Sequence, residues 1–388
     1  MYFWDILIYS DLIFFIFVAM TVLYMGVFAM AAMMNRQSEV PKAKRENRFI
    51  IMIPAHKNGP GTEKTVMSIL GQIYPQRQFD VTVISDHLDE MSNFRLAQQP
   101  VTLLISNFKK YSKAKALQLG INNLPRLKIY DIAIVLTPGS VVEPEFLAQM
   151  NDAYESAGTK AILAHSVSRN IDTIPARLST VFDEINNSIF RRGHIALGLS
   201  SAISSTGIAF DFNWFKQNVM DDKSMWNDKG LELMLLRQNV YIDYFDDIMV
   251  FDEKARLAED FNRQSRYRIL SQLASITNSI RYLPGAIINH QYGLIDKILQ
   301  WLLFPRMILM VVITLMSIIM PFIYFTLAIK WWILFAVVVF IFAVATPNYL
   351  VDDKWDRTFF SLPIVLLSSL LAKTPLGKRL NQYVNKKI

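Results

Sequence analysis

The chain has 388 residues, of which 52% are hydrophobic and 19% are charged, and its formal net charge is +7. It is too apolar for an ordinary soluble protein and too charged for one that lies wholly in a membrane, so we predict a soluble domain attached to a few membrane helices. The absence of cysteine excludes disulfide bonds, thiolate metal sites and a cysteine nucleophile. The positive charge favours membrane lipid or phosphorylated substrates as partners and argues against nucleic acid, because the basic residues gather near the membrane segments.

Three apolar segments are long enough to span a bilayer, which takes roughly 20 residues. They are residues 12–34, 307–329 and 331–351. The first lacks a basic leader and is too long for the apolar part of a signal peptide, so it is predicted to be an uncleaved anchor. The other two have only Lys330 between them and are predicted to form a transmembrane hairpin.

Basic residues predict the orientation of these spans. Five of them follow the first span: Arg36, Lys42, Lys44, Arg45 and Arg48. That end should therefore face the cytoplasm, which makes the chain a multi-pass protein of the cell (inner) membrane with a cytoplasmic domain. The short apolar run 358–372 includes Pro363 and is predicted to be re-entrant or interfacial. If it crossed the membrane, the basic tail would lie outside (Lys373, Lys378, Arg379, Lys386 and Lys387).

The segment 294–303 carries Asp296 and Lys297 on one side and Trp301 opposite, a pattern typical of an amphipathic helix at the membrane interface. The alternative is that it begins the second membrane helix. The predicted order is an anchor (1–34), a cytoplasmic domain (35–289), an interfacial helix (290–304), a transmembrane hairpin (305–351), and a re-entrant or interfacial helix with a basic cytoplasmic tail (352–388).

The cytoplasmic domain begins with alternating strands and helices. Strands are predicted at 49–54, 80–85, 101–105 and 131–136, and helices at 61–72 and 112–123. This alternation indicates an α/β fold with a mostly parallel sheet and right-handed crossovers. In such sheets ligands bind beyond the carboxyl ends of the strands. Those ends here read Pro54-Ala55-His56, Ser85-Asp86-His87 and Thr137-Pro138-Gly139-Ser140.

Several motifs together resemble the membrane-bound family 2 glycosyltransferases, which include cellulose and hyaluronan synthases. In the nucleotide-sugar half these are Ile53-Pro54-Ala55-His56-Lys57-Asn58, Ser68-Ile69-Leu70-Gly71-Gln72-Ile73-Tyr74-Pro75, Val83-Ile84-Ser85-Asp86 and Ser112-Lys113-Ala114-Lys115. In the acceptor half they are Ser205-Thr206-Gly207, Asn227-Asp228, Val250-Phe251-Asp252-Glu253-Lys254 and Arg263-Gln264-Ser265-Arg266-Tyr267. Their order and spacing extend the resemblance over nearly the whole chain.

The resemblance implies a GT-A (Rossmann-like) fold and an inverting transferase, in which one carboxylate removes a proton from the acceptor hydroxyl. Asp228 matches the position of that base; alternatively, Asn227 or Asp228 simply caps a helix. The implied nucleotide-sugar site consists of Pro54, His56, Asp86, Lys113, Thr137 and Ser140. By this resemblance, Asp86 would hold the uracil or ribose side of a UDP-sugar, and Lys113 would neutralise its diphosphate. The alternatives are that Asp86 is a turn residue and that Lys113 is a solvated lysine. The implied acceptor site consists of Thr206, Gly207, Arg266 and Tyr267.

Two motifs depart from the family pattern. Thr137-Pro138-Gly139-Ser140 occupies the place of an Asp-x-Asp pair that binds Mg²⁺ or Mn²⁺, and neutral hydroxyls are poor substitutes, which argues against this cofactor. The Gln-x-x-Arg-Trp motif lacks its tryptophan: Arg266 and Tyr267 are the nearest match, and the competing alignment puts Tyr267 and Arg268 in its last two places. His56 and His87 are conceivable metal ligands, but no carboxylate cluster is spaced in the sequence to join them, so no metal-ligand set is predicted.

Two functions therefore stay open. One is an inverting transferase that moves a sugar from a nucleotide-sugar to a lipid-linked or polysaccharide acceptor at the cytoplasmic face. The other is a catalytically silent relative that serves as a scaffold or regulatory subunit of a polysaccharide-synthesis complex. The retained Asp86 and Asp228 favour the first hypothesis, and the altered motifs favour the second.

Overall fold

The computed structural model describes residues 2–34, 40–125, 127–221, 227–353, 355–371 and 374–386. Among the residues used above to predict topology, Arg36, Lys373 and Lys387 lie outside the described residues, as does Ala372, the end of the fourth apolar run. The chain packs as two compact units. The sheet unit comprises Gln37–Arg169 and Leu199–Glu253, and the helical unit comprises Met1–Arg36, Asn170–Gly198 and Lys254–Ile388. Residues 170–198 and 254–289, assigned above to the cytoplasmic domain, thus pack within the helical unit.

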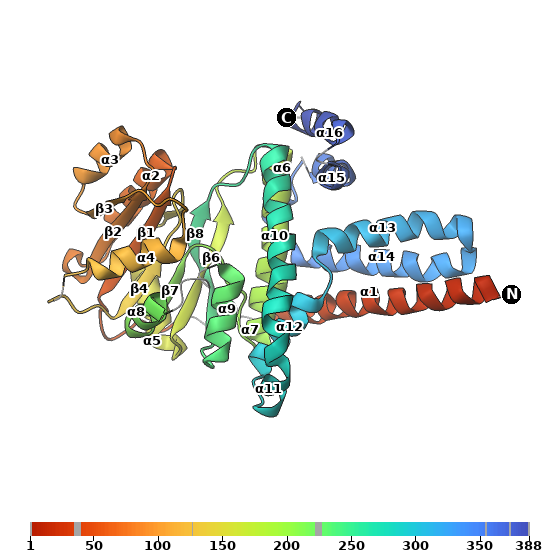
Figure 1. Cartoon of the computed structure of the whole chain (residues 1–388), viewed down its shortest axis with the longest axis horizontal. Coiled ribbons are helices and arrows are strands. Elements are labelled where there is room, and N and C mark those ends of the chain that lie inside the picture. The colour runs from red at the N-terminus through yellow and green to blue at the C-terminus, as the bar shows by residue number, and fades with distance from the viewer. Residues whose placement is uncertain are drawn as a thin grey trace. The chain divides into compact units, whose positions relative to one another are not determined.

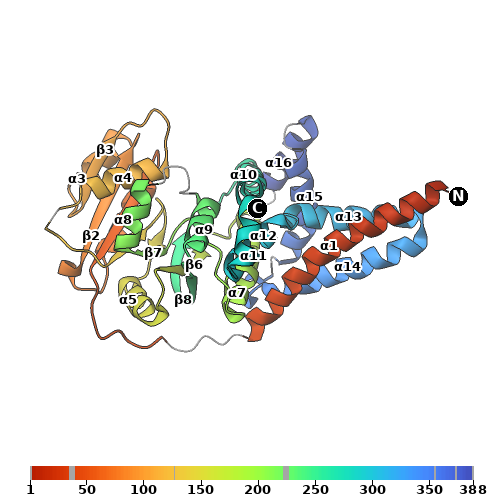
Figure 2. The ribbon, with the colours of Figure 1, turned by 60° about the horizontal axis from the view of Figure 1, so that its bottom comes forward.

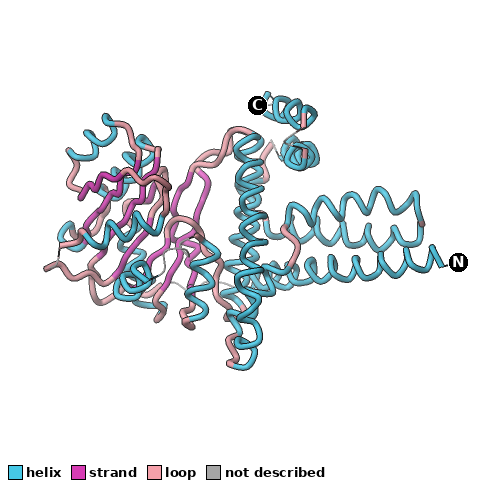
Figure 3. The backbone as a smooth tube through the Cα atoms, viewed as in Figure 1, coloured by secondary structure: helices cyan, strands magenta, loops and turns pink. Residues whose placement is uncertain are grey.

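The sheet unit is built on an eight-stranded mixed sheet of order β3-β2-β1-β4-β7-β6-β8-β5 (Figure 3). The strands are β1 (Phe49–His56), β2 (Phe79–Asp86), β3 (Thr102–Ser106), β4 (Ile132–Val135), β5 (Val141–Val142), β6 (Ala161–Ser168), β7 (Ile208–Asp211) and β8 (Ile242–Asp252). The first four pair parallel with one another, as predicted. β7 then pairs antiparallel with both β4 and β6, and β6 pairs parallel with β8. The prediction of an α/β fold is confirmed.

Apolar residues explain the position of β1 at the centre of the parallel part. Residues 49–55 of this strand are all buried, as expected of a parallel strand covered on both faces. The helices of this unit are α2 (Gly59–Leu70), η1 (Gln76–Gln78), α3 (Glu90–Ala97), α4 (Lys113–Asn122), α5 (Phe146–Ala157), α8 (Phe212–Asp221) and α9 (Asp228–Arg237). Val66 and Ile69 of α2 pack in the same core as Ile51 and Ile53 of β1. Because β1, β2 and β4 are parallel, their carboxyl ends lie at one edge of the sheet.

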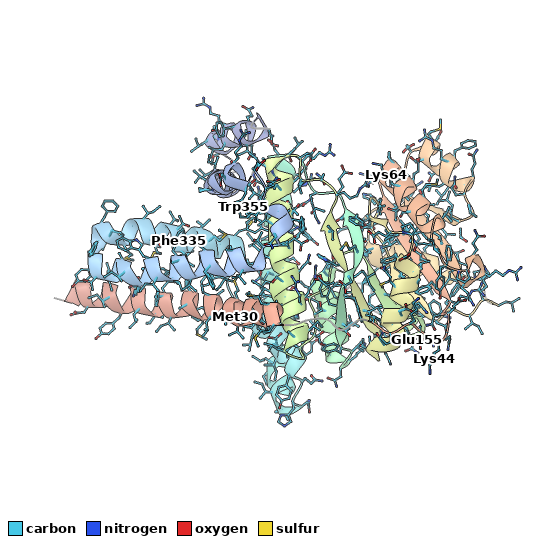
Figure 4. All side chains as sticks on the ribbon, turned by 180° about the vertical axis from the view of Figure 1, so that it is seen from behind. Met30, Lys44, Lys64, Glu155, Phe335 and Trp355 are labelled. Atoms are coloured by element: carbon cyan, nitrogen blue, oxygen red, sulfur yellow. The ribbon has the colours of Figure 1, made fainter. Side chains whose placement is uncertain are left out.

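Among its described residues, the helical unit contains three helices long and apolar enough to cross a membrane: residues 5–34 of α1 (Tyr2–Met34), α13 (Arg306–Ile323) and α14 (Phe325–Ala345). They run side by side in both ribbon views (Figures 1 and 2). Large apolar side chains cover their outward surfaces, among them Met30 and Phe335, which are 63% and 40% exposed (Figure 4). An outward apolar surface of this kind suits contact with lipid.

The hairpin turn lies at Tyr324, so the prediction that Lys330 joins the two helices was wrong. Pro321 has no N–H to donate to the carbonyl of Ser317, which weakens the last turn of α13. The indole N–H of Trp332 donates to that carbonyl instead, at 2.9 Å. Lys330 lies inside α14, where it forms an ion pair with buried Asp11 of α1. This pairing explains how a charged residue is accommodated within so apolar a helix.

The other helices of this unit are α6 (Ile174–Asn186), the π-helix η2 (Asn187–Arg192), α7 (Gly193–Ala196), α10 (Ala258–Ser279), η3 (Ile280–Tyr282), α11 (Leu283–Ile288), α12 (Tyr292–Leu302), η4 (Asn348–Leu350), α15 (Trp355–Leu370) and α16 (Pro375–Lys386). α10 runs across one end of the membrane-type helices (Figure 1). The fourth apolar run forms α15, which packs through Val365 against Phe182 of α6 and Phe261 of α10.

α12 is separate from the membrane helix that follows it, because Pro305 stands between Leu302 and Arg306. Its faces differ from the prediction. Lys297 and Trp301 share the buried face, being 0% and 1% exposed, since residues four apart lie on the same side of a helix. Asp296 accepts a hydrogen bond from the hydroxyl of Tyr24 at 2.8 Å and lies 3.2 Å from Nε2 of His194. The helix is thereby fixed to α1 and α7.

Candidate functional site

A buried carboxylate lies between two histidines at the carboxyl ends of β1 and β2. Asp86 has no exposed surface, and its Oδ2 is 2.7 Å from Nδ1 of His56 while its Oδ1 is 2.9 Å from Nδ1 of His87. The backbone N–H of Phe108 also donates to Oδ1, at 2.9 Å. Adjacent parallel strands place His56 directly opposite Asp86 in the register. No carboxylate was expected from the sequence to join the two histidines. The structure shows that Asp86 contacts both.

Electrostatics at this cluster favour an ionised Asp86. Burial raises the pKa of the carboxyl, but the hydrogen bonds from Phe108, His56 and His87 outweigh it and hold the pKa below its usual value. The ring of Tyr111 stacks on His56 at 4.5 Å between centroids. Burial and the charge of Asp86 raise the pKa of Tyr111 to about 12. Because both imidazoles and the carboxylate offer ligand atoms within 4.8 Å of one another, this group could hold a metal ion.

The end of β4 carries a cluster of three hydroxyl groups. Oγ of Ser140 lies 2.9 Å from Oγ1 of Thr137 and 2.9 Å from Oγ1 of Thr206. The backbone N–H of Thr137 donates to Oγ1 of Thr206 at 3.2 Å. Ser140 and Thr206 are 0% and 1% exposed. The three hydroxyls are therefore hydrogen-bonded within the cluster, and those of Ser140 and Thr206 are turned away from solvent while Thr137 is only partly buried.

This hydroxyl cluster does not fit the Mg²⁺ or Mn²⁺ site that the family pattern implies. Such ions need carboxylate and water oxygens around an accessible position. Here the side chains are neutral, and Ser140 and Thr206 are buried. We therefore assign no step of catalysis to a metal held at this position.

Gly207 has a structural reason to be glycine. Its φ of +74° belongs to the left-handed region, and a Cβ atom here would lie 2.8 Å from Cγ2 of Val250. Thr206 is buried as well. The structure therefore gives Thr206 and Gly207, two of the four predicted acceptor residues, a role in shaping the loop, and neither position offers an exposed contact surface.

The predicted base and the predicted diphosphate lysine meet at one serine. Ser205, which is exposed, donates from its hydroxyl to Oδ2 of Asp228 at 2.7 Å, and its carbonyl oxygen accepts from Nζ of Lys113 at 3.1 Å. Asn227 caps α9 by accepting from the N–H of Gly230. The cap is thus supplied by Asn227, and the carboxylate of Asp228 is left for other contacts. Burial lowers the pKa of Lys113, while the charge of Asp228 opposes this shift.

The remaining predicted residues are distributed as follows. Pro54 lies in β1, where its carbonyl accepts from the hydroxyl of Tyr111 at 3.4 Å. Arg266 and Tyr267 are exposed on α10 of the helical unit. Sequence reasoning missed Ser205, Tyr111 and Phe108 as partners of these groups. Two of these carried a signal in the sequence, because Ser205 lies in the predicted acceptor loop and Tyr111 precedes the Ser112-Lys113 motif.

The helical unit holds a cationic cluster that the sequence did not reveal. Asp183 of α6 lies 3.0 Å from Nζ of Lys254 and 3.2 Å from a guanidinium nitrogen of Arg268. Burial raises the pKa of Asp183, but Arg268, Lys254 and Arg191 together hold it well below its usual value. The charges of Arg268, Asp183 and Arg191 also act on Arg306, the first residue of α13. Two cations thus pair with one buried carboxylate, and Arg191 and Arg306 lie near enough to interact with the same group electrostatically.

The fold resembles that of a solved glycosyltransferase. The mannosyltransferase PcManGT from Pyrobaculum calidifontis, solved with GDP-Man and Mn²⁺, matches with a TM-score of 0.52 and 12% identity, over 88% of this chain and 96% of that one. This likeness establishes the fold. S. aureus TarS (residues 1–349) matches over 87% of this chain and 90% of its own at 12% identity, but its TM-score of 0.41 is too low to support an argument. No family model matches the sequence, and neither does any curated protein.

Proposed function

We propose that this chain is a membrane-bound inverting family 2 glycosyltransferase with a GT-A fold, which moves a sugar from a nucleotide-sugar to a lipid-linked or polysaccharide acceptor at the cytoplasmic face. The observation that carries the proposal is the group formed by Lys113, Ser205 and Asp228, in which one serine contacts both a cation and a carboxylate. Such a transferase needs positive charge where diphosphate leaves and a base where the acceptor loses its proton. The fold shared with a mannosyltransferase that binds GDP-Man supports a nucleotide-sugar donor.

In the proposed reaction the acceptor hydroxyl attacks the anomeric carbon of the donor sugar. The bond between that carbon and the diphosphate oxygen breaks, and the nucleoside diphosphate leaves with the bonding electrons. Asp228 accepts the hydroxyl proton, and its hydrogen bond with Ser205 orients it for this step. The charge of Lys113 stabilises the departing diphosphate.

The nucleotide end of the donor is proposed to bind at the strand ends that carry Pro54, His56 and Asp86. Asp86 is buried and already accepts hydrogen bonds from three groups, so it would act by holding the partly exposed rings of His56 and His87 toward the ligand. At the end of β4, Thr137 is only partly buried and would contact the sugar-phosphate. The hydroxyl of Ser140 would hold it in place through their hydrogen bond.

The acceptor is proposed to carry phosphate or to be membrane-embedded. The cationic cluster supports this, because Lys254 and Arg268 pair with Asp183, and Arg191 and Arg306 add positive charge close by. Guanidinium groups match phosphate oxygens well, and the cluster lies at the start of a membrane-type helix. Arg266 and Tyr267, exposed on α10, remain predicted acceptor contacts.

The test uses the full-length protein in detergent. UDP and GDP are titrated by calorimetry, with and without Mn²⁺, and transfer is assayed with labelled UDP- and GDP-sugars and a membrane lipid extract. Asp228→Asn should lower transfer about 100-fold or more, as expected for loss of a general base, with nucleotide affinity unchanged. Asp152→Asn on α5 makes the same charge change at a residue that accepts a hydrogen bond from Ala43, and it should leave transfer unchanged.

Two outcomes would contradict the proposal. Unchanged turnover in Asp228→Asn would remove Asp228 from the role of base. Failure of the wild-type protein to bind either nucleotide would instead favour the scaffold or regulatory subunit, for which the altered Asp-x-Asp position is the supporting observation.

A further inference from the structure

We propose that His56, Asp86 and His87 form a binding site for a borderline transition-metal cation of the Zn²⁺, Co²⁺ or Ni²⁺ class. The inference starts from the convergence of two rings on one carboxylate. Nδ1 of His56 and Nδ1 of His87 lie 2.7 and 2.9 Å from the two oxygens of Asp86, and one ligand atom of each residue lies within 4.8 Å of the others. Ligand atoms around a tetrahedral metal with bonds of about 2.1 Å lie roughly 3.4 Å apart. Small shifts of the two rings would therefore bring both nitrogens and a carboxylate oxygen to such separations.

The three side chains are held in place before any ion binds. Asp86 is buried, and the N–H of Phe108 fixes its carboxylate, as outer partners commonly orient metal-binding carboxylates. The ring of His56 stacks on Tyr111, with an angle of 23° between the ring planes. Parallel register places His56 opposite Asp86, so one residue of the site comes from β1 and a second from β2.

The site is also open to solvent. The side chains of His56 and His87 are 32% and 44% exposed, in contrast to the fully buried carboxylate between them. An ion can therefore enter past the rings, and three protein ligands leave a coordination position for water or another ligand. Binding requires each neutral ring to carry its proton on Nε2 and to offer the Nδ1 lone pair, so the two hydrogen bonds to Asp86 are exchanged for metal bonds.

The donor set selects the class of metal. Two imidazole nitrogens and one carboxylate oxygen suit Zn²⁺, Co²⁺ and Ni²⁺, whereas Mg²⁺ prefers oxygen ligands throughout. The site is separate in residues and in chemistry from the hydroxyl cluster of Thr137, Ser140 and Thr206. The proposal does not depend on the chain being a transferase, since it concerns metal binding without nucleotide.

The experiment uses the full chain, purified in detergent with a histidine-free tag and stripped with EDTA. Co²⁺ is titrated by absorption spectroscopy and Zn²⁺ by calorimetry, both without nucleotide. One equivalent should bind, with cobalt bands of a low-coordinate nitrogen–oxygen site, and a large excess of Mg²⁺ should not compete. His56→Ala and His87→Ala should each weaken binding about tenfold or more, and the double variant should abolish it.

His290→Ala, at an exposed histidine of the helical unit, is the matched control and should bind as the wild type does. His87 has a φ of 54°, where asparagine is tolerated, so His87→Asn replaces the alanine variant if that variant unfolds. Absence of stoichiometric Zn²⁺ or Co²⁺ binding, or undiminished binding in the double variant, would overturn the inference. Neither result bears on whether the wild-type protein binds nucleotide, because the metal titrations are made without nucleotide.

Discussion

Adjacent residues of one loop in the sheet unit serve two groups of opposite character. Ser205 is exposed and contacts two charged side chains, Lys113 and Asp228, whereas Thr206 is buried and contacts the hydroxyls of Thr137 and Ser140. The charged group has the components that a displacement reaction needs. The neutral group satisfies its own hydrogen bonds. The position where the family resemblance led us to expect an acidic pair therefore holds a self-contained cluster of hydroxyls, and charged side chains meet at the adjacent serine.

The largest expected effect comes from forcing charge into the neutral group with Ser140→Asp. An ionised carboxylate with no cation partner at a position of 0% exposure should lower the free energy of unfolding by roughly 3–5 kcal/mol. It should not create a Mn²⁺ site, because solvent does not reach the position. Thermal unfolding in detergent and Mn²⁺ calorimetry measure the two outcomes, with the exposed Ser156→Asp as control. A stable variant that binds Mn²⁺ would show that the cluster is a dormant metal site.

Gly207→Ala tests how rigidly the loop separates the two groups. The new Cβ atom would combine a left-handed φ of +74° with a contact of 2.8 Å to Val250, which should cost about 2–4 kcal/mol of unfolding free energy. Gly158 is a matched control, since its φ is +62° and nothing lies within 4 Å of its Cβ position. Gly158→Ala should therefore cost only about 1–2 kcal/mol, measured as the difference in thermal midpoint. Equal losses in the two variants would mean that the loop yields easily around Val250.

Substitutions at two neighbouring residues should separate an effect on the free energy of unfolding from an effect on the rate of transfer. Thr206→Val keeps the shape but removes a buried hydroxyl with contacts to Thr137 and Ser140, which should cost about 1–3 kcal/mol. Ser205→Ala lies at an exposed position and should change stability by less than about 0.5 kcal/mol, yet slow transfer about tenfold by freeing Asp228. Thermal unfolding and transfer assays of both variants provide the comparison. If both variants lost only stability, Ser205 would not be part of the reactive group.

The strand ends could be predicted because their positions follow from local patterns. The apolar run at 49–54 and the one at 131–136 identify parallel strands, and parallel strands bring their carboxyl ends to one edge. The sequence pattern therefore predicts that His56, Asp86 and Thr137 lie in one region. The resemblance likewise indicated Lys113 and Asp228, but not that both would contact Ser205.

The rest depended on contacts between distant segments. Asp86 joins two histidines because the strand register sets one ring opposite it and the backbone at His87, with a φ of 54°, turns the other ring back. The cationic cluster around Asp183 needs α6 and α10 to pack together, which no periodicity specifies. The hairpin turn was misplaced because Lys330 was taken as a polar break, whereas Asp11, more than 300 residues away in the chain, neutralises it within the helix.

The smallest expected effect concerns the pH dependence of nucleotide binding at the charged group. Lys113 favours diphosphate only while protonated. Burial lowers its pKa, so this contribution is complete at low pH and is lost as pH rises through a folded-state pKa below the usual lysine value of 10.5. Nucleoside diphosphate affinity should therefore fall several-fold on the alkaline side, an effect of the size expected for one charge-assisted contact. Calorimetric titrations between about pH 7 and pH 10 measure it.

Two variants assign that pH dependence to Lys113. Lys113→Arg should bind diphosphate over the whole range, because a guanidinium stays charged there, and Lys113→Met should bind weakly with no alkaline step. Lys115→Met, on the exposed side of the same helix, should retain the wild-type profile. An alkaline step of unchanged size in Lys113→Met would mean that another group titrates, and Lys113 would then serve only to hold the loop at Ser205.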